Sequence, residues 1–167
     1  NLKAWEEAEL GMRLTAAGWS LERLDHQSTR HTGHAASTCE LLRSMWRSRR
    51  LMANGVLIKQ SIGKPWFFKA FRLLFHPLLV ILMWGGAAIA VGLSVVMQDW
   101  QWVAGYMLAV SCLVLLLTVY KRSVKQALLS LGVWHFMAAA LLLGLREGVV
   151  PPTDPIRSLV LSSPSTD

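Results

Sequence analysis

The chain has 167 residues, of which 53% are hydrophobic, and it carries a formal net charge of +7. This combination is unusual for a soluble domain and is typical of a membrane protein whose cationic flanks meet anionic lipid headgroups. The basic residues cluster beside hydrophobic segments, which argues against a nucleic-acid-binding surface. Because the sequence opens with Asn1 rather than Met, we expect it to be the C-terminal piece of a longer protein.

Residues 5–19 predict an amphipathic helix that begins with carboxylates and ends at a glycine. Glu6, Glu7 and Glu9 crowd the first turn, where the helix macrodipole favours negative charge. Gly18 is placed to take the left-handed conformation that ends many helices. Three apolar residues share one face of this helix and are expected to be buried: Leu10, Leu14 and Ala17.

The spacing leaves two interpretations of these carboxylates open. Glu6 and Glu7 stand where the expected buried face meets a loop, a place where a general base can be held. The plainer interpretation is a solvated acidic first turn, with Glu9 paired to Arg13 four residues further on.

Residues 19–24 alternate apolar and polar side chains, which predicts a half-buried strand. A helix followed by a strand after a glycine suggests the closing unit of an α/β domain, so residues 1–36 are interpreted as the end of such a domain. The polar stretch 25–36 contains three histidines. His34 could contact a phosphate or ligate a metal, but without acidic or cysteine partners nearby a surface-loop histidine explains it equally well.

A second helix is predicted to begin at Ser37, because Glu40 completes a capping box with it. Arg43 and Arg47 offer bidentate donors suited to phosphate oxygens, and Trp46 offers a flat face on which a sugar ring could stack. The alternative is a basic amphipathic helix that lies on the membrane surface, and both interpretations can hold together.

Residues 37–76 are interpreted as basic and aromatic interfacial helices. Residues 55–63 are expected to form a short connector. Residues 63–72 mix aromatic rings with lysine and arginine, as segments at the headgroup level do.

A membrane region is predicted over residues 77–145. Residues 77–97 and 102–120 are uncharged and long enough to cross the hydrocarbon core, which takes about 20 helical residues. Cations precede the first span and follow the second, whereas the turn at 98–101 carries only an acid. The positive-inside rule therefore places both flanks in the cytoplasm and the turn outside.

Residues 126–145 form a possible third span, which would put the C-terminus outside. His135 near its middle argues for the alternative of a buried or interfacial helix, since an ionisable side chain is costly at the bilayer centre. The tail, residues 146–167, is rich in Pro, Ser and Thr and is expected to be disordered.

The order of these parts resembles the C-terminal part of a membrane-bound family-2 glycosyltransferase, an inverting enzyme of the GT-A type. This superfamily contains cellulose and hyaluronan synthases and bacterial exopolysaccharide enzymes. Glu6-Glu7 resembles the Glu-Asp pair of that family, whose second member is the catalytic base. Two further pairs resemble the residues that usually follow it: Arg13-Leu14 and Gly18-Trp19.

The chain departs from the family pattern at two places. Glu7 stands where the family usually has Asp, which moves the carboxylate by one methylene. Processive members carry Gln-x-x-Arg-Trp in the following helix. When Trp46 is aligned with the Trp of this motif, Leu42 stands at the Gln position and Met45 at the Arg position. The departure favours transfer of a single sugar or a short chain.

The resemblance implies transfer from a nucleotide-sugar donor to a lipid-linked or glycan acceptor at the bacterial inner membrane, with the catalytic part cytoplasmic. Glu7 would be the base, and Glu6 would orient it or bind the acceptor. The substrate or diphosphate contacts would come from four residues: His34, Arg43, Trp46 and Arg47. A divalent metal, Mg or Mn, is expected with its ligands upstream of this chain in an Asp-x-Asp motif, and only His34 is a candidate ligand here.

Two other function classes compete with this one. A non-catalytic membrane anchor or assembly subunit would use the hairpin and the basic helix to recruit partners, without any role for the carboxylates. A small transporter would use His135 as an intramembrane proton group, although no acidic partner is visible in the spans.

Overall fold

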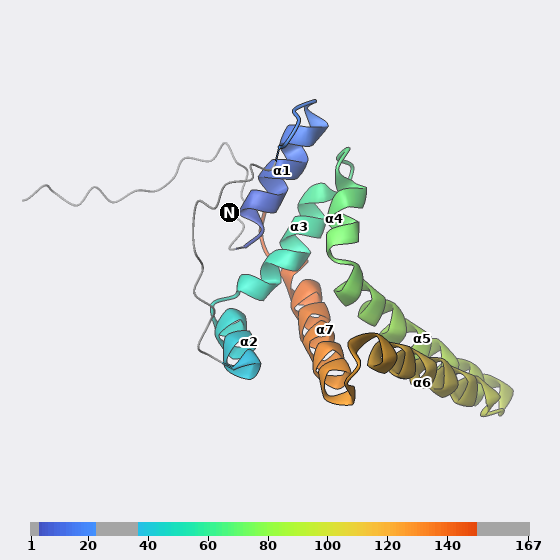
Figure 1. Cartoon of the computed structure of the whole chain (residues 1–167). Helices are drawn as coiled ribbons and strands as arrows, with labels where there is room; N and C mark the ends of the chain where they lie inside the picture. Colours follow the sequence, from blue (N-terminus) through green and yellow to red (C-terminus); the bar gives the residue numbers. More distant parts are fainter. Residues whose placement is uncertain (1–3, 23–36, 150–167) are drawn as a thin grey trace, which may run out of the picture.

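The computed structural model describes residues 4–22 and 37–149. Within these ranges the regular structure is entirely helical, and Figure 1 shows its arrangement. The elements are α1 (Glu6–Ala16), α2 (Thr38–Arg47), the 3-10 helix η1 (Arg50–Met52), α3 (Ala53–Ser61), α4 (Phe67–Leu73), α5 (Phe75–Met97), α6 (Gln101–Lys121) and α7 (Val124–Gly144). The short helices gather around α3, and the hairpin of α5 and α6 projects away from them.

The prediction of a strand over residues 19–24 is wrong for residues 19–22, the part of this segment that the structure describes. These residues follow the end of α1 without strand geometry, and the side chains of Trp19 and Leu21 are 67% and 57% exposed. A strand needs a neighbour for its backbone hydrogen bonds, and no strand is present in the described ranges to provide one. The α/β part of the expected fold is therefore not seen, and residues 23–36, with His34, lie outside the described residues.

The C-terminal end of α1 forms as expected. Gly18 has φ +90°, and the amides of Gly18 and Trp19 donate to the carbonyls of Thr15 and Leu14 over 3.2 and 3.0 Å. This pair of bonds is the Schellman arrangement, which satisfies carbonyls that the helix leaves without partners.

The buried face of α1 differs from the expectation. Met12 is the buried residue of the helix, whereas Leu10 is 53% exposed and Ala17 is also exposed. Met12 lies two turns after Trp5, on the same side of the helix, and both contact the core. Because α1 packs against the core through Trp5 and Met12, the face of the helix that carries Leu10 points toward solvent.

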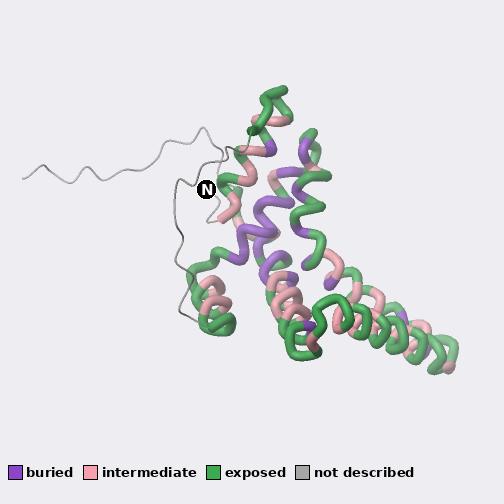
Figure 2. Tube along the Cα trace, in the orientation of Figure 1, coloured by how far each residue is buried: buried purple, intermediate pink, exposed green. Residues whose placement is uncertain are grey.

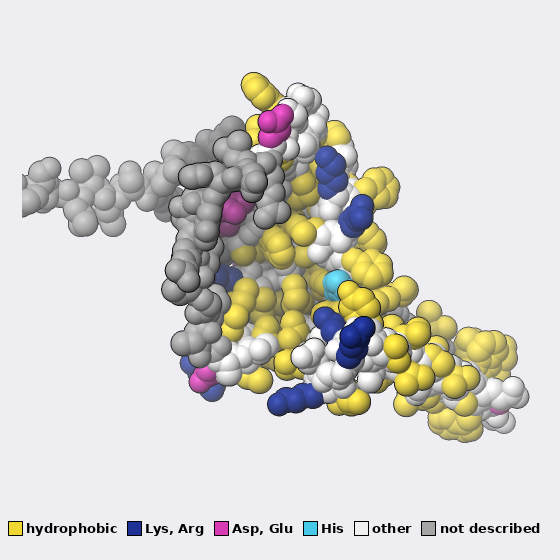
Figure 3. All heavy atoms as spheres, viewed as in Figure 1, with side chains coloured by type: hydrophobic (Ala, Val, Ile, Leu, Met, Phe, Trp, Pro, Cys, Tyr) yellow, Lys and Arg dark blue, Asp and Glu magenta, His cyan; other side chains and the backbone are white. Residues whose placement is uncertain are grey.

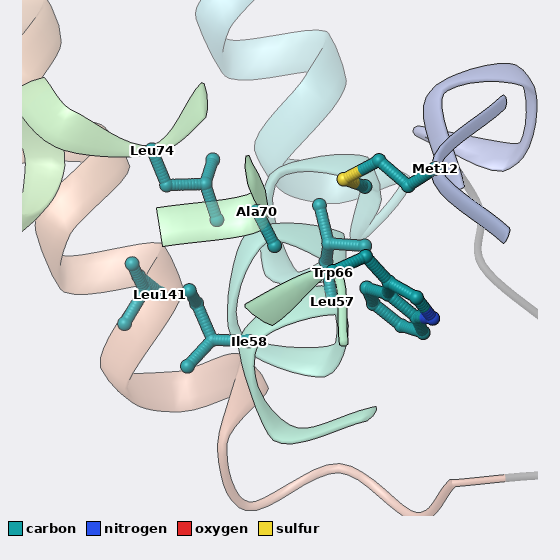
Figure 4. Packing of buried hydrophobic residues seen from close by; sticks show 7 residues of the cluster. All are labelled: Met12, Leu57, Ile58, Trp66, Ala70, Leu74 and Leu141. Carbon is teal, nitrogen blue, oxygen red and sulfur yellow. The ribbon is translucent and has the colours of Figure 1, made fainter. Parts of the chain in front are cut away.

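The expected connector at 55–63 is instead mostly the buried helix α3. Every residue from Leu51 to Ile58 is buried, and Leu57 is fully inaccessible. Figure 4 shows the core cluster around this helix, which joins the four helices α1, α3, α4 and α7. Its members are Met12, Leu57, Ile58, Trp66, Ala70, Leu74 and Leu141. Burial of each large member contributes about 1.5–3 kcal/mol, so this cluster is the main attachment of the short helices to the membrane region.

Helix α2 begins as the sequence predicts. The Ser37 hydroxyl accepts from the Glu40 amide, and the Ser37 backbone amide donates to the Glu40 carboxylate over 2.8 Å. The backbone and hydroxyl hydrogen bonds from Ser37 lower the pKa of Glu40. The helix ends at Arg47, and Arg49 takes a left-handed conformation with φ 59° before η1 begins.

The hairpin has the length and composition of two membrane spans. Helices α5 and α6 have 23 and 21 residues, and both are apolar enough to cross a bilayer. In the connection between them, the Asp99 carboxylate accepts a hydrogen bond from the backbone N–H of Gln101 over 2.9 Å. The Tyr106 hydroxyl donates to the Met83 carbonyl over 3.0 Å and fixes the register between the two helices.

The outer surface of the hairpin is suited to lipid. No residue of α6 is buried, and most of its exposed side chains are large and apolar. Figure 2 shows that most of the hairpin is exposed. On the face drawn in Figure 3, the part of the hairpin farthest from the short helices is mainly apolar. Lys and Arg side chains lie near α4 and near the end of α6. The chain is therefore a membrane protein whose cations flank an apolar hairpin.

Helix α7 is also long and apolar enough to span, but both of its ends lie near the same end of the hairpin. Only two residues, Arg122 and Ser123, separate its start from the end of α6. Its last turns contribute Leu141 to the core cluster that contains Leu74, the residue immediately before α5. If the hairpin crosses the bilayer, α7 returns to the side on which α5 begins. The structure thus favours the buried or interfacial alternative over a third crossing.

Two glycines bring the end of α7 into direct backbone contact with η1 and α3. A Cβ on Gly144 would lie 2.0 Å from the Met52 carbonyl oxygen, and a Cβ on Gly55 would lie 2.1 Å from the Leu141 carbonyl oxygen. Real Cβ atoms essentially never approach so closely, so only glycine fits at both positions. The contact fixes where α7 ends relative to α3.

Candidate functional site

The carboxylate end of α1 is held by an aromatic residue. Trp5 precedes the helix with φ 71°, a conformation that is uncommon for a residue with a bulky side chain. Its indole N–H donates to the Oδ1 atom of Asn54 over 2.7 Å. Asn54 is 1% exposed and is the second residue of α3. This hydrogen bond joins the start of α1 directly to the helix at the centre of the core.

Glu6 and Glu7 follow Trp5 and are exposed in the first turn of α1. Among residues 4–22 and 37–149, neither carboxylate has a cation within ion-pair distance. Glu9, in contrast, lies 3.6 Å from Arg13, which confirms the expected pair. The Trp5 anchor therefore fixes the position of the first turn, in which the Glu6 and Glu7 carboxylates are exposed. The Glu9 carboxylate instead pairs with Arg13 of the same helix.

Helix α2 presents its arginines and its tryptophan differently. Arg43 and Arg47 are exposed, and no carboxylate in the described part of the chain lies within ion-pair distance of either. Trp46 is half-buried against Phe136 of α7, with ring centroids 5.1 Å apart and the planes at 67°. Trp46 thus has an aromatic partner on α7, in a T-shaped arrangement.

The carboxylate end of α1 and the basic end of α2 meet the same stretch of chain. We call residues 47–54 the α2–α3 junction. Arg47 ends α2 at one side of the junction, and Asn54 receives Trp5 at the other. The start of α1 and the end of α2 are therefore joined to the same short stretch of chain, although they belong to separate helices.

A second set of contacts holds the junction to the end of α7. Arg49 forms an ion pair with Glu147, and the Lys59 ammonium donates to the Glu147 carbonyl over 3.0 Å. Arg49 is thereby engaged, whereas Arg43 and Arg47 have no carboxylate within ion-pair distance among residues 4–22 and 37–149. The sequence reasoning missed these contacts, together with the role of Asn54. The signal for Asn54 was a lone amide within the apolar run Leu51–Ile58.

Trp5 gives a direct test of the anchor. Replacement of Trp5 by phenylalanine keeps an aromatic ring but removes the N–H, so the buried Asn54 amide loses its partner. We expect a loss of about 1–3 kcal/mol in the free energy of unfolding, measured by denaturant titration in detergent. Trp19→Phe is the matched control, because that ring is 67% exposed at the other end of α1. Equal shifts for the two variants would show that the hydrogen bond does not hold α1.

The described residues contain no group of three or more His, Cys, Asp or Glu side chains placed to hold a metal ion. His34, the one metal-ligand candidate from the sequence, lies outside them. Cys39 and Cys112 are both free thiols at exposed positions.

Comparisons of the chain with protein-family models, curated proteins and solved structures found no match.

Proposed function

We propose that the chain is the membrane-anchored C-terminal part of an inverting glycosyltransferase. It would transfer a sugar from a nucleotide-sugar donor to a lipid-linked or glycan acceptor in polysaccharide or glycolipid synthesis. One observation carries the proposal: the exposed pair Glu6-Glu7 is held by the Trp5–Asn54 hydrogen bond beside the helices that lead into the membrane.

In this proposal Glu7 removes the proton from the acceptor hydroxyl as its oxygen attacks the anomeric carbon. Glu6 orients that carboxylate or binds the acceptor. Arg43 and Arg47, which have no ion-pair partner in the described ranges, face the leaving diphosphate. A divalent metal, Mg or Mn, would neutralise further diphosphate charge from ligands upstream of this chain, with His34 the only candidate within it.

The packing of Trp46 changes its proposed role. Its contact with Phe136 fixes how α2 lies against α7. Trp46 therefore gains a second role, in which it positions Arg43 and Arg47, one turn before and one residue after it, besides the proposed stacking on an acceptor. The proposed location is the bacterial inner membrane, with α1 and α2 on the cytoplasmic side, where nucleotide sugars are made.

The alternative is a non-catalytic membrane anchor or assembly subunit, and one observation favours it. No residue of α6 is buried, so this helix offers its full length to lipid or to another membrane protein. The two proposals differ in what they require of the carboxylates, because an anchor needs the hairpin but neither Glu6 nor Glu7.

Because the proposal places the nucleotide-binding half upstream, this chain alone is not expected to be active, and the test uses the full-length protein in membranes supplied with radiolabelled nucleotide sugars, one donor at a time. The proposal predicts that label from at least one donor enters a lipid-extractable or polymeric product only when the protein is present. Absence of incorporation from every donor, with the protein inserted in the membrane, would favour the anchor.

A further inference from the structure

We propose that the groove between α2 and α7 is a binding site for one hydrocarbon chain of an anionic phospholipid. The two helices touch where Trp46 meets Phe136, and beside this contact a cavity of about 550 Å³ remains. That volume lies within the range of about 300–1,000 Å³ found for ligand sites. The inference does not require sugar transfer, but it shares Arg43 with the proposed diphosphate contact.

The lining of the groove identifies an apolar occupant. Apart from one arginine and one thiol, the side chains are apolar or absent: Leu42, Trp46, Leu128, Leu129, Gly132, Val133 and Phe136. The α7 side is formed by a helix apolar enough to enter a bilayer. A polar peptide would leave its backbone groups without partners on such a surface, whereas an acyl chain has none to satisfy.

The charge at the groove identifies the headgroup. Arg43 is the one charged side chain of the lining, and no carboxylate in the described ranges pairs with it. Arg47 lies one turn further along α2 and is exposed. An arginine beside an apolar groove matches a phosphate joined to a hydrocarbon chain, and a net anionic lipid adds attraction to the basic helix.

Gly132 provides a way to fill the groove without disturbing the protein. A Cβ placed on it meets no atom within 4 Å. Leucine at this position would therefore extend into the groove that the lipid chain is proposed to fill. Leucine also has a higher helix propensity than glycine, so the exchange should not destabilise α7. Gly105 in α6 also has open space around its Cβ but does not line the groove, so Gly105→Leu is the matched control.

The experiment uses the intact protein in nanodiscs that contain phosphatidylglycerol with a photoreactive group in its acyl chain. Cross-linked residues are mapped by mass spectrometry. We expect cross-links at Leu128, Leu129 and Phe136 that fall at least fivefold in Gly132→Leu and stay unchanged in Gly105→Leu. Cross-links on the exposed face of α6 should persist in both variants, which shows that each is folded and inserted.

Competition between the probe and unlabelled lipids measures how much the headgroup contributes to binding. Unlabelled phosphatidylglycerol should displace the probe about tenfold more effectively than phosphatidylcholine, the ratio that corresponds to 1.4 kcal/mol. Arg43→Gln should abolish this preference, and Arg50→Gln, which changes an exposed arginine outside the lining, should keep it. Inorganic phosphate should not compete, because the site needs the hydrocarbon chain.

Three results would overturn the proposal. The first is groove cross-linking that is unaffected by Gly132→Leu. The second is equal displacement by the two lipids in the unaltered protein. The third is a groove that is protected from lipid by another protein segment, which would identify that segment as the occupant.

Discussion

Replacement of Glu7 by glutamine is expected to lower the rate of sugar transfer by roughly 10²–10⁴-fold, the usual contribution of a general base. Glutamine has nearly the shape of glutamate but cannot accept the acceptor's proton. Because Glu7 is exposed and has no ion-pair partner in the described residues, the change should leave folding and membrane insertion intact. The measurement is transfer of labelled sugar by membranes that contain equal amounts of each protein.

Glu9→Gln is the control for this prediction, since it makes the same chemical change two residues away. It removes only the pair that Glu9 forms with Arg13 four residues further along the helix, which is worth ~0.3–0.5 kcal/mol, so transfer should stay within about twofold. Turnover by Glu7→Gln at the rate of the unaltered protein would reject Glu7 as the base. Equal losses in both variants would show that the helix, and not this carboxylate, is what matters.

Replacement of Gly144 by alanine is expected to destabilise the protein by about 3 kcal/mol, at the upper end of overpacking effects. The added Cβ would meet the Met52 carbonyl oxygen at 2.0 Å and the Gly55 Cα at 3.0 Å. Both are backbone atoms, which cannot turn aside as the tip of a flexible side chain can. The end of α7 must then move away from η1 and α3, and the loss is measured by thermal unfolding in detergent.

Gly132→Ala is the comparison for this variant, because its Cβ meets no atom within 4 Å. It should stabilise α7 by about 0.5–1 kcal/mol, as alanine does in place of a mid-helix glycine. Displacement of α7 should also break the contacts of Glu147 with Arg49 and Lys59, so residues near 147 should become easier to cleave with protease in Gly144→Ala. An unchanged unfolding temperature for Gly144→Ala would contradict the backbone contact.

Local patterns predicted the parts of the fold whose causes are local. Length and apolar composition predict α5 and α6, because a chain that crosses hydrocarbon must satisfy its own backbone. Ser37 and Glu40 predict the start of α2, and Gly18 predicts the end of α1, since caps depend on residues only a few positions apart.

The strand at 19–24 and the connector at 55–63 show where local patterns fail. Six alternating residues are too few to separate a strand from an exposed segment, and residues 19–22 have no partner strand in the described structure. Helix α3 has the opposite difficulty. From Ala53 to Ile58 it is buried on every side, so its sequence lacks the polar face by which an amphipathic helix is recognised.

The candidate site was predicted only in part. The pattern identified Glu6 and Glu7 and the pair of Glu9 with Arg13, all within one helix. It could not identify Trp5–Asn54, because these residues are 49 positions apart and meet only through tertiary packing. The same reason explains why the docking of α7 through Gly55 and Gly144 was not foreseen.

We propose that α1, α2 and the end of α7 lie on one face of the membrane and form the site there. Labelling of single cysteines with an impermeant maleimide in sealed vesicles tests this most directly, in a background with Cys39 and Cys112 replaced by serine. Three exposed positions receive the cysteine in turn: Ala17, Trp100 and Gly148. We expect positions 17 and 148 to be labelled from the same face and position 100 from the opposite face. Labelling of position 148 together with position 100 would show that α7 crosses the membrane and would contradict this arrangement of α1, α2 and α7.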